Sequence, residues 1–243
     1  MDSNTVRLLN QLNQHFYSVV GAHFDTTRSA PWPGWSRCLP YIKKAAARLQ
    51  ALSVFDVGCG NGRFGLFLHE AGVLMRYTGL DNTHFLLHKA AQKFPQGSFL
   101  QADALQTWPL APGQRFDVIA LFGVLHHVPG FVQRQQLITR MVDRLQPGGL
   151  GIVTLWKFME QARFRERVVP WQAAEVPPAY HNLQLEQHDY LLRWKQHEDT
   201  LALRYCHYVD ATEQAQLFGA WPILAEYQAD TANHYLIIQR PAL

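Results

Sequence analysis

The stretch from Val54 to Arg63 constrains the fold of this chain more than any other. Its sequence is VFDVGCGNGR, an apolar run typical of a buried strand that stops at a glycine-rich turn. Apolar residues at helical spacing follow at Phe64, Phe67 and Leu68. In such a strand–loop–helix unit, glycines let the backbone approach a ligand, and the helix start presents N–H groups and a positive dipole to it. The stretch therefore predicts a ligand-binding turn.

A second strand-like run, YTGLD, strengthens this prediction. It ends at Asp81, a little over twenty residues beyond Gly58, which is the offset at which a strand-end carboxylate meets the hydroxyls of a bound ribose. A helix cap is the plainer interpretation of such an aspartate, but the glycine turn before it favours ribose binding. A nicotinamide dinucleotide usually requires Gly-x-Gly-x-x-Gly, whereas this turn has Gly58, Gly60 and Gly62. S-adenosylmethionine, which has no phosphate, is the better match.

Strand-like and helix-like patterns alternate along the chain. We expect helices over residues 5–20, 36–49, 62–71, 83–94, 131–145 and 211–219. We expect strands over residues 53–57, 75–80, 98–101, 116–121, 151–156, 201–209, 223–227 and 235–239, the last two as an antiparallel pair. This order predicts an α/β, Rossmann-like fold, with a mostly parallel seven-stranded sheet, helices on both faces and an inserted cap segment.

One domain over residues 1–243 accommodates this pattern. Within it, residues 1–50 supply N-terminal helices and a loop, and residues 51–156 supply the cofactor-binding core. Residues 157–200 are rich in charge, Trp, His and Pro, and we interpret them as an inserted substrate lid over the strand ends. Residues 201–243 supply the C-terminal strands and helix.

Composition excludes several classes of protein. The hydrophobic share of 48% and the charged share of 17% are those of a soluble globular protein. No stretch approaches the roughly 18 apolar residues of a membrane span, and the N-terminal segment lacks the apolar core of a signal peptide. Cys38, Cys59 and Cys206 are far apart and form no zinc-ligand pattern. We therefore expect free thiols, a cytoplasmic location, and neither a membrane nor a metal partner.

The net charge of +3 permits a polyanionic partner without demanding one, because the chain has no dense Lys/Arg run. Basic residues scatter through the C-terminal third instead. They are Arg163, Arg165, Arg167, Arg193, Lys195 and Arg204. A solvated face and a nucleic-acid surface are both open interpretations of this distribution.

Five motifs between residues 50 and 156 together resemble the class I S-adenosylmethionine-dependent methyltransferases. They are DVGCGNG, GLD, ADA, FDVI and LQPGG. The resemblance implies that the first turn holds the methionine end of the cofactor, Asp81 the ribose, the ADA motif the adenine, and the backbone after the FDVI strand the sulfonium. The cofactor-binding residues expected on this basis are Tyr17, Arg28, Asp56, Gly58, Cys59, Gly60, Asn61, Asp81, Asn82, Asp103, Ala104, Phe122 and Gly123.

Flanking motifs are similar to a narrower group, the tRNA wobble-uridine carboxymethyl methyltransferases. They are HFDTTR with a following Trp-Pro, VLHHV, LW, DYLLRWK and RYCHY. That family esterifies a carboxymethyl group on the wobble uridine of the tRNA anticodon. Its eukaryotic members typically have Tyr-Tyr-His where this chain has Tyr205, Cys206 and His207, and the segment between Trp156 and Asp189 has no match. The resemblance implies tRNA as a partner, and eukaryotic relatives also use a small activating protein.

Methylation of a carboxylate needs little acid–base chemistry, because the acceptor is already ionised at neutral pH. Catalysis would rest on holding oxygen, methyl and sulfur in line, and an Arg on the attacking oxygen would slow the step. Arg28, Arg204 and His207 are therefore expected to bind the spare oxygen, the uracil edge or a phosphate. Arg28 could alternatively hold the cofactor's carboxylate. The remaining residues that the resemblance assigns to catalysis are His126, Asp189 and Trp194.

Plainer interpretations remain open for several of these residues. His127 reads as a capping or core histidine, and Arg204 and His207 could form the exposed face of a strand. A second functional hypothesis is a small-molecule O- or carboxyl-methyltransferase whose apolar lid contains Trp32, Trp171 and Trp194. A third is a cofactor-binding module without enzymatic activity, and the intact glycine turn argues against it.

Overall fold

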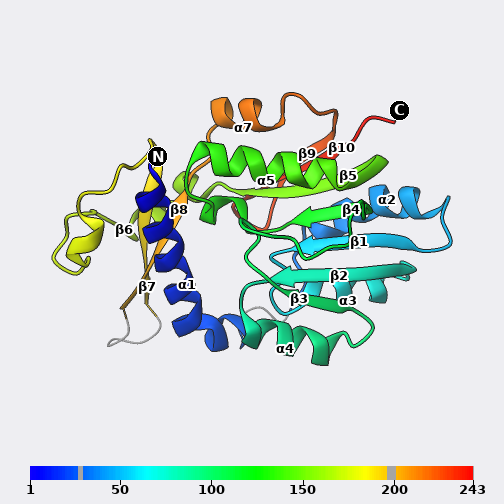
Figure 1. Ribbon diagram of the computed structural model, residues 1–243, viewed down its shortest axis with the longest axis horizontal. Helices are drawn as coiled ribbons and strands as arrows, with labels where there is room; N and C mark the ends of the chain where they lie inside the picture. The colour runs from blue at the N-terminus through cyan, green and yellow to red at the C-terminus, as the bar shows by residue number, and fades with distance from the viewer. Residues whose placement is uncertain (27–29, 196–200, 243) are drawn as a thin grey trace.

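Seven strands form the central sheet, and its order is β3-β2-β1-β4-β5-β10-β9 (Figure 1). The computed structural model describes residues 1–26, 30–195 and 201–242, with only the backbone described for residues 21–26, 195 and 201. The strands are β1 (Leu52–Val57), β2 (Met75–Asp81), β3 (Ser98–Gln101), β4 (Phe116–Leu121), β5 (Leu145–Trp156), β9 (Ile223–Ala229) and β10 (Asn233–Gln239). β1 to β5 pair in parallel, and β10 is antiparallel to both β5 and β9. The predicted Rossmann-like sheet is therefore confirmed.

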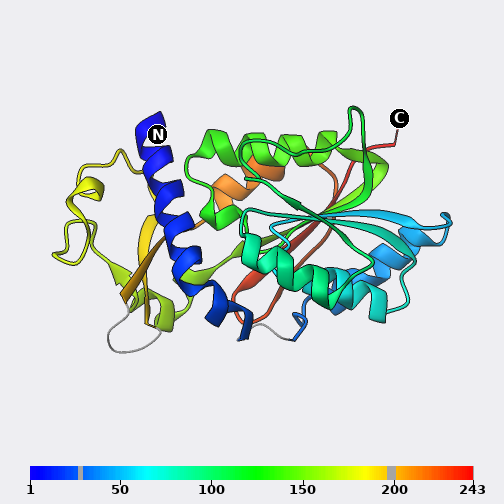
Figure 2. The same cartoon turned by 60° about the horizontal axis from the view of Figure 1, so that its bottom comes forward.

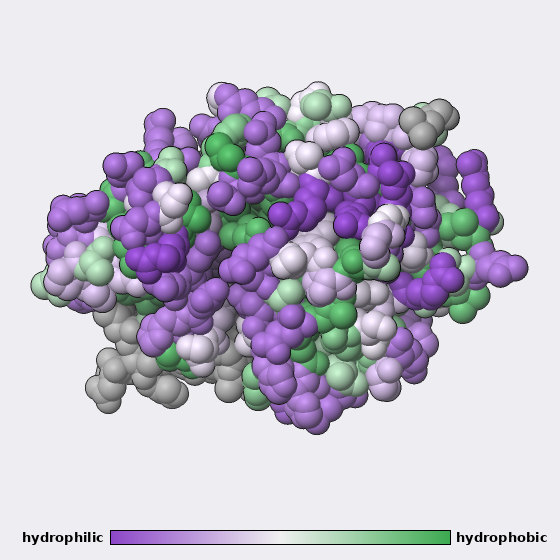
Figure 3. Space-filling model, in the orientation of Figure 1, coloured by the Kyte–Doolittle hydropathy of each residue, from purple (hydrophilic) through white to green (hydrophobic). Residues whose placement is uncertain are grey.

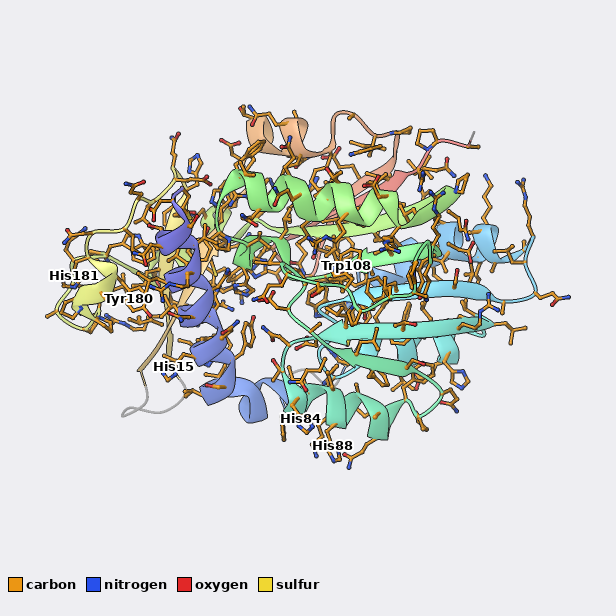
Figure 4. All side chains as sticks on the ribbon, in the orientation of Figure 1. His15, His84, His88, Trp108, Tyr180 and His181 are labelled. Atoms are coloured by element: carbon orange, nitrogen blue, oxygen red, sulfur yellow. The ribbon has the colours of Figure 1, made fainter. Side chains whose placement is uncertain are left out.

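Helices cover both faces of this sheet because each buried strand alternates its side chains between two cores. On β1, Phe55 and Val57 belong to the core under α5 (Phe131–Asp143) and α7 (Ala211–Phe218). Leu52 and Val54 belong to the opposite core, which α2 (Trp35–Ala46) and α3 (Arg63–Glu70) cover. α4 (His84–Lys93) lies on the α3 side, and its exposed His84 and His88 point away from the sheet (Figure 4).

A second, three-stranded antiparallel sheet lies beside the first (Figures 1 and 2). Its order is β6-β7-β8, formed by β6 (Val168–Val169), β7 (Asp189–Lys195) and β8 (Leu201–His207). α1 (Ser3–Thr26) packs along it, where Leu9 and Leu12 share a core with Leu191 and Tyr205. The predicted insertion thus folds together with the following strand and the N-terminal helix.

Short helices connect these parts. They are η1 (Leu125–His127), η2 (Phe158–Glu160), α6 (Ala162–Arg165) and η3 (Pro178–Tyr180). Tyr180 and His181 lie on the side of the second sheet that faces away from the central sheet (Figure 4). η1 follows β4 directly, and α6 follows β5 through η2, so both lie near the carboxyl ends of central strands.

The largest differences from the predicted boundaries lie in α1 and at the junction of α5 and β5. α1 spans Ser3–Thr26, longer than the predicted residues 5–20. α5 ends at Asp143, and β5 includes the predicted turn at residues 147–149. Phe116 pairs with Leu145 and Val118 with Leu150, so the extra residues of β5 form an irregularity in the ladder. A proline–glycine run is thus accommodated as a bulge within the strand.

Polar side chains cover most of the face shown in Figure 3, and apolar residues gather there in smaller patches. Within the described residues, no helix has the length and apolar character that crossing a membrane requires.

Candidate cofactor and acceptor site

A cavity of about 510 Å³ opens at the carboxyl ends of β1 and β4. These two strands flank the point where the strand order reverses, which is where ligands bind in open parallel sheets. One half of the cavity lining comes from the turns after β1, β2, β3 and β4. Most of the other half comes from α1, α6, β7, β8 and the ends of β5 and β10, so the cavity is bounded by both sheets.

The turn after β1 depends on glycine. Gly58 has φ +76°, and a Cβ built on it would lie 2.4 Å from Cγ2 of Val124. Gly60 has φ +54°, but a Cβ there would meet no atom within 4 Å. At Gly58 both the backbone conformation and the lack of space oppose a side chain. At Gly60 the backbone conformation opposes one, and a side chain there would project toward the cavity that Gly60 lines.

Asp81 ends β2 beside this turn and lines the cavity. Its Oδ2 accepts the backbone N–H of Gly60 at 2.9 Å, and its Oδ1 accepts that of Thr83 at 2.8 Å. Burial raises the pKa of Asp81, while these hydrogen bonds oppose the shift. Each carboxylate oxygen can accept a further hydrogen bond, so Asp81 can receive the two hydroxyls of a ribose.

Asp56 lies beneath the turn and does not border the cavity. Its Oδ2 accepts the hydroxyl of Tyr77 at 2.6 Å, and its Oδ1 has no hydrogen-bond partner among the described residues. Burial raises its pKa to about 7, although the Tyr77 hydrogen bond lowers it. Asp56 thus places an unsatisfied buried acceptor directly behind the glycine turn, outside the cavity lining.

The strand ends of β3 and β4 complete this half of the cavity. Asp103 lines it, and one of its oxygens accepts the N–H of Leu105 at 2.9 Å. The N–H of Gly123 donates to Oγ1 of Thr154 at 2.8 Å, which fixes the turn after β4. A Cβ on Gly123 would lie 3.5 Å from the ring of Trp32.

Most of the predicted cofactor-binding residues therefore meet in one place. The cavity is lined by Tyr17, Gly58, Cys59, Gly60, Asn61, Asp81, Asn82, Asp103, Ala104, Phe122 and Gly123. Carboxylates, an amide and a backbone turn shaped by glycine suit the amine, hydroxyls and adenine of S-adenosylmethionine, so the residues present fit that cofactor. Arg28 lies outside the described residues.

Two adjacent histidines separate the halves of the cavity. Nδ1 of His127 lies 3.1 Å from the carbonyl oxygen of Tyr205 and 3.4 Å from Nδ2 of Asn13. Nε2 of the same ring lies 2.7 Å from the hydroxyl oxygen of Tyr17. His126 lies 4.1 Å from the His127 ring and 5.0 Å from the Trp156 ring, both measured between centroids. Of the predicted catalytic residues, His126 thus lines the cavity beside an aromatic wall.

His126 and His127 also lie near Cys206, with one potential metal-ligating atom of each within 4.8 Å of the others. Burial raises the pKa of the Cys206 thiol to about 11, so the thiol is protonated at neutral pH. Because His127 already contacts Tyr17 and Tyr205, we assign it a structural role in joining α1, η1 and β8.

Arg204 lies at the centre of the second half of the cavity. Its guanidinium carbon lies 4.7 Å from the ring centroid of Trp156, 5.4 Å from that of Trp194 and 5.5 Å from that of Phe16. The residue is 5% exposed, and its Nε has no hydrogen-bond partner among the described residues. Arg204 is therefore a buried charge surrounded by aromatic rings, at the edge of an open cavity.

Asp189 and His207, both predicted to be catalytic, lie outside the cavity lining. Nδ1 of His207 lies 2.7 Å from Oδ1 of Asp189, and its Nε2 lies 2.6 Å from Oε2 of Glu213. Arg134 pairs with Glu213 at 2.6 Å and with Glu186 at 2.8 Å. This buried ionic network joins β7 and β8 to α5 and α7 behind the cavity.

Several cavity residues were not singled out by sequence reasoning. They include Asn10, Gln14, Leu86, Phe164, Asp230 and Asn233. The small-molecule hypothesis places three tryptophans in an apolar lid. Trp32 and Trp194 line the cavity, whereas Trp171 packs in the core under α1. Arg163 and Arg167 also line the cavity, and their place in a basic stretch was the only sequence indication.

The family described as a methyltransferase domain matches residues 54–149. The tRNA (carboxymethyluridine(34)-5-O)-methyltransferase of Arabidopsis thaliana is 31% identical over 145 residues, which are 58% of this chain and 31% of that protein. The protein of the same name from Saccharomyces cerevisiae is 26% identical over 210 residues, which are 75% of this chain and 71% of that protein. This chain thus spans about a third of the length of its Arabidopsis relative.

The crystal structure of the N-methyltransferase NodS from Bradyrhizobium japonicum, in complex with S-adenosyl-L-homocysteine, shares the fold. The TM-score is 0.57 at 18% identity, and the match covers 98% of this chain and 100% of that chain. At this identity the likeness concerns the fold alone. Residues 54–149 are thus similar to a methyltransferase domain, and the chain shares its fold with a solved N-methyltransferase.

Proposed function

We propose that the chain transfers a methyl group from S-adenosylmethionine to the carboxylate of a carboxymethyl group on the wobble uridine of tRNA. The observation that carries this proposal is Arg204, a buried guanidinium on the cavity wall whose Nε has no hydrogen-bond partner among the described residues. A buried charge without a counter-ion is costly, so an anionic group of the acceptor is the natural complement.

The surroundings of Arg204 favour a planar acceptor. Trp156 and Trp194 both border the cavity and both lie against the guanidinium. Unstacked RNA bases bind by stacking on aromatic side chains and on arginine planes. A uridine that carries a carboxylate combines the two chemical features that this wall can bind.

The chain's own residues have two tasks in this reaction. When bound, the cofactor supplies a methyl group on a sulfonium, which is the electrophile. Arg204 binds the carboxylate oxygen that does not attack. The negative charge on the attacking oxygen decreases as the ester forms, so an arginine bound to that oxygen would slow the step. The glycine turn would hold the methionine end of the cofactor, and Asp81 would hold its ribose. No general base is required, because the carboxylate is ionised at neutral pH.

Asp189 and His207 take a positioning role in this proposal. His207 follows Arg204 on β8, and Asp189 begins β7, which carries Trp194. Their buried contact holds the two strands in register, and the register places Arg204 and Trp194 at the cavity.

The test is methyl-ester formation on tRNA. The chain is incubated with labelled S-adenosylmethionine and with tRNA that carries or lacks the carboxymethyl group, and nucleosides are then analysed by mass spectrometry. We expect ester only on the carboxymethylated tRNA and its loss in Arg204→Met. Arg165→Met, on an exposed helix face, is the matched control. Product from small carboxylic acids, with no competition by tRNA, would instead support the small-molecule alternative.

A further inference from the structure

Two arginines in and just after α6 line the half of the cavity that contains Arg204, which we call the acceptor half. Arg163 and Arg167 both line it, and both are exposed to solvent. Their guanidinium carbons lie 4.7 Å and 5.7 Å from the ring centroid of Phe164, which also lines the cavity. A pair of solvated positive charges is therefore held at the mouth of the cavity by one aromatic ring.

These arginines continue into the wall that surrounds Arg204. The centroids of the Phe164 and Trp156 rings are 4.8 Å apart in an edge-to-face contact, and Trp156 in turn lies 4.7 Å from the Arg204 guanidinium. Cations and aromatic rings thus alternate from the solvent to the buried end of the cavity. A base bound near Trp156 would have Arg204 on its buried side and the exposed arginines on its solvent side.

The two arginines differ from their neighbours in their partners. Within the described residues, neither Arg163 nor Arg167 takes part in an ion pair, whereas Arg193 pairs with Glu175. Arg165, on the same short helix, donates to the carbonyl oxygen of Met159 at 2.8 Å and does not line the cavity. Arg163 and Arg167 therefore differ from Arg165 in their place at the cavity wall, although all three lie close together in the sequence.

We propose that Arg163 and Arg167 form a phosphate-binding subsite for the RNA strand on either side of the acceptor nucleotide. This inference rests on the proposed function and assigns to it the residues that bind the RNA backbone beside the acceptor nucleotide. Arginine contacts to phosphates fix the position of a nucleic acid, and aromatic contacts receive its base. The cavity wall offers exposed arginines for the phosphates and, deeper, aromatic rings for the base of a nucleotide that is turned out of the RNA strand.

The experiment compares an anticodon stem–loop that carries 5-carboxymethyluridine with the free 5-carboxymethyluridine nucleoside. The double variant Arg163→Ala/Arg167→Ala is tested against the native chain, with Arg165→Ala as the matched control. Stem–loop affinity is measured by fluorescence anisotropy over a range of salt concentrations, and kcat/KM for methylation is measured on both substrates. Cofactor affinity by calorimetry confirms that the variants are folded.

We expect the double variant to lose stem–loop affinity by about 10–100-fold, while Arg165→Ala changes it less than about threefold. The dependence of log affinity on log salt should become shallower by about 1.4, the value for two phosphate contacts on a single strand. The loss of kcat/KM on the stem–loop should exceed the loss on the nucleoside by at least about tenfold.

Other outcomes separate the two proposals. An equal loss of stem–loop affinity in Arg165→Ala would show that any positive charge on this surface attracts RNA, and it would overturn the proposed subsite. So would equal losses of kcat/KM on stem–loop and nucleoside. If the native chain methylates neither substrate, the proposed function fails, and the anisotropy measurement still decides whether these arginines bind RNA.

Discussion

Nδ1 of His207 lies 2.7 Å from Oδ1 of Asp189, and neither residue borders the cavity. The opposite nitrogen of the same ring lies 2.6 Å from Glu213, which also pairs with Arg134. Burial lowers the pKa of His207, but its hydrogen bonds to Asp189 and Glu213 raise it, and the net shift is upward. A histidine between two carboxylates is thus a charged crosslink between the second sheet and the helices of the first.

This crosslink predicts a pH-dependent stability. Because the folded pKa of His207 is raised, its contribution is fully present below the unfolded value of about 6.5 and is lost as pH rises through the folded pKa. We expect His207→Asn to lower the free energy of unfolding by about 3–5 kcal/mol near pH 6 and by less near pH 9. Urea unfolding of both proteins across this range measures the difference.

The matched control for that measurement is His84→Asn, since His84 is exposed on α4. It should change stability by less than about 0.5 kcal/mol at every pH. A second limit lies at acidic pH. His207 and Arg134 outweigh the effect of burial and lower the pKa of Glu213, so its contribution disappears as pH falls through that folded value. A pH-independent loss in His207→Asn would contradict the charged crosslink.

Asp81→Ala should abolish tight cofactor binding. The carboxylate accepts N–H groups of Gly60 and Thr83 and is the predicted acceptor for the ribose hydroxyls. Hydrogen bonds to a charged group contribute about 1.5–3 kcal/mol each, so affinity should fall by at least about tenfold. Calorimetry with S-adenosylmethionine measures this. Asp103→Ala is a useful comparison at the predicted adenine end, and unchanged affinity in Asp81→Ala would disprove the ribose assignment.

Arg204→Met should separate stability from activity. Removal of a buried charge whose Nε has no partner among the described residues should raise the free energy of unfolding by about 1–3 kcal/mol, because Met still packs against the aromatic rings. Methyl-ester formation should fall by at least about tenfold, the value of one charged hydrogen bond. Urea unfolding and the tRNA assay measure the two effects. A variant that is destabilised and fully active would show that Arg204 is a packing residue.

Two glycines of the first turn should respond differently to alanine. At Gly58 an alanine would have to adopt a left-handed backbone conformation, and its Cβ would lie 2.4 Å from Val124. We therefore expect a loss of about 2–4 kcal/mol in the free energy of unfolding. At Gly60 only the backbone conformation opposes the change, and the loss should be about 1–2 kcal/mol. Thermal or urea unfolding ranks the two variants, and equal losses would mean that Val124 moves aside.

Local patterns identified most of the residues that line the cavity at the ends of β1 to β4. The glycine turn, Asp81 and the strand ends are consecutive features of one βαβ arrangement, so their spacing along the chain determines their position in space. The acceptor half was harder to predict. β8 reads as a strand, but nothing local indicates that it pairs with β7 in a separate sheet. That pairing turns Arg204 toward the cavity and directs His207, three residues later, into a buried ionic network.

The N-terminal helix explains why a fragment is a poor substitute for the chain. α1 carries Asn10, Gln14 and Tyr17 on the cavity wall, and its apolar side chains Leu9 and Leu12 fill the core of the second sheet. Residues 51–156 hold every strand-end group expected to grip the cofactor, yet in isolation they would leave that ligand exposed to bulk water on one side. Side chains from the N-terminal helix, from the strand ends of the central sheet and from the second sheet therefore border one cavity, and α1 contributes to its wall.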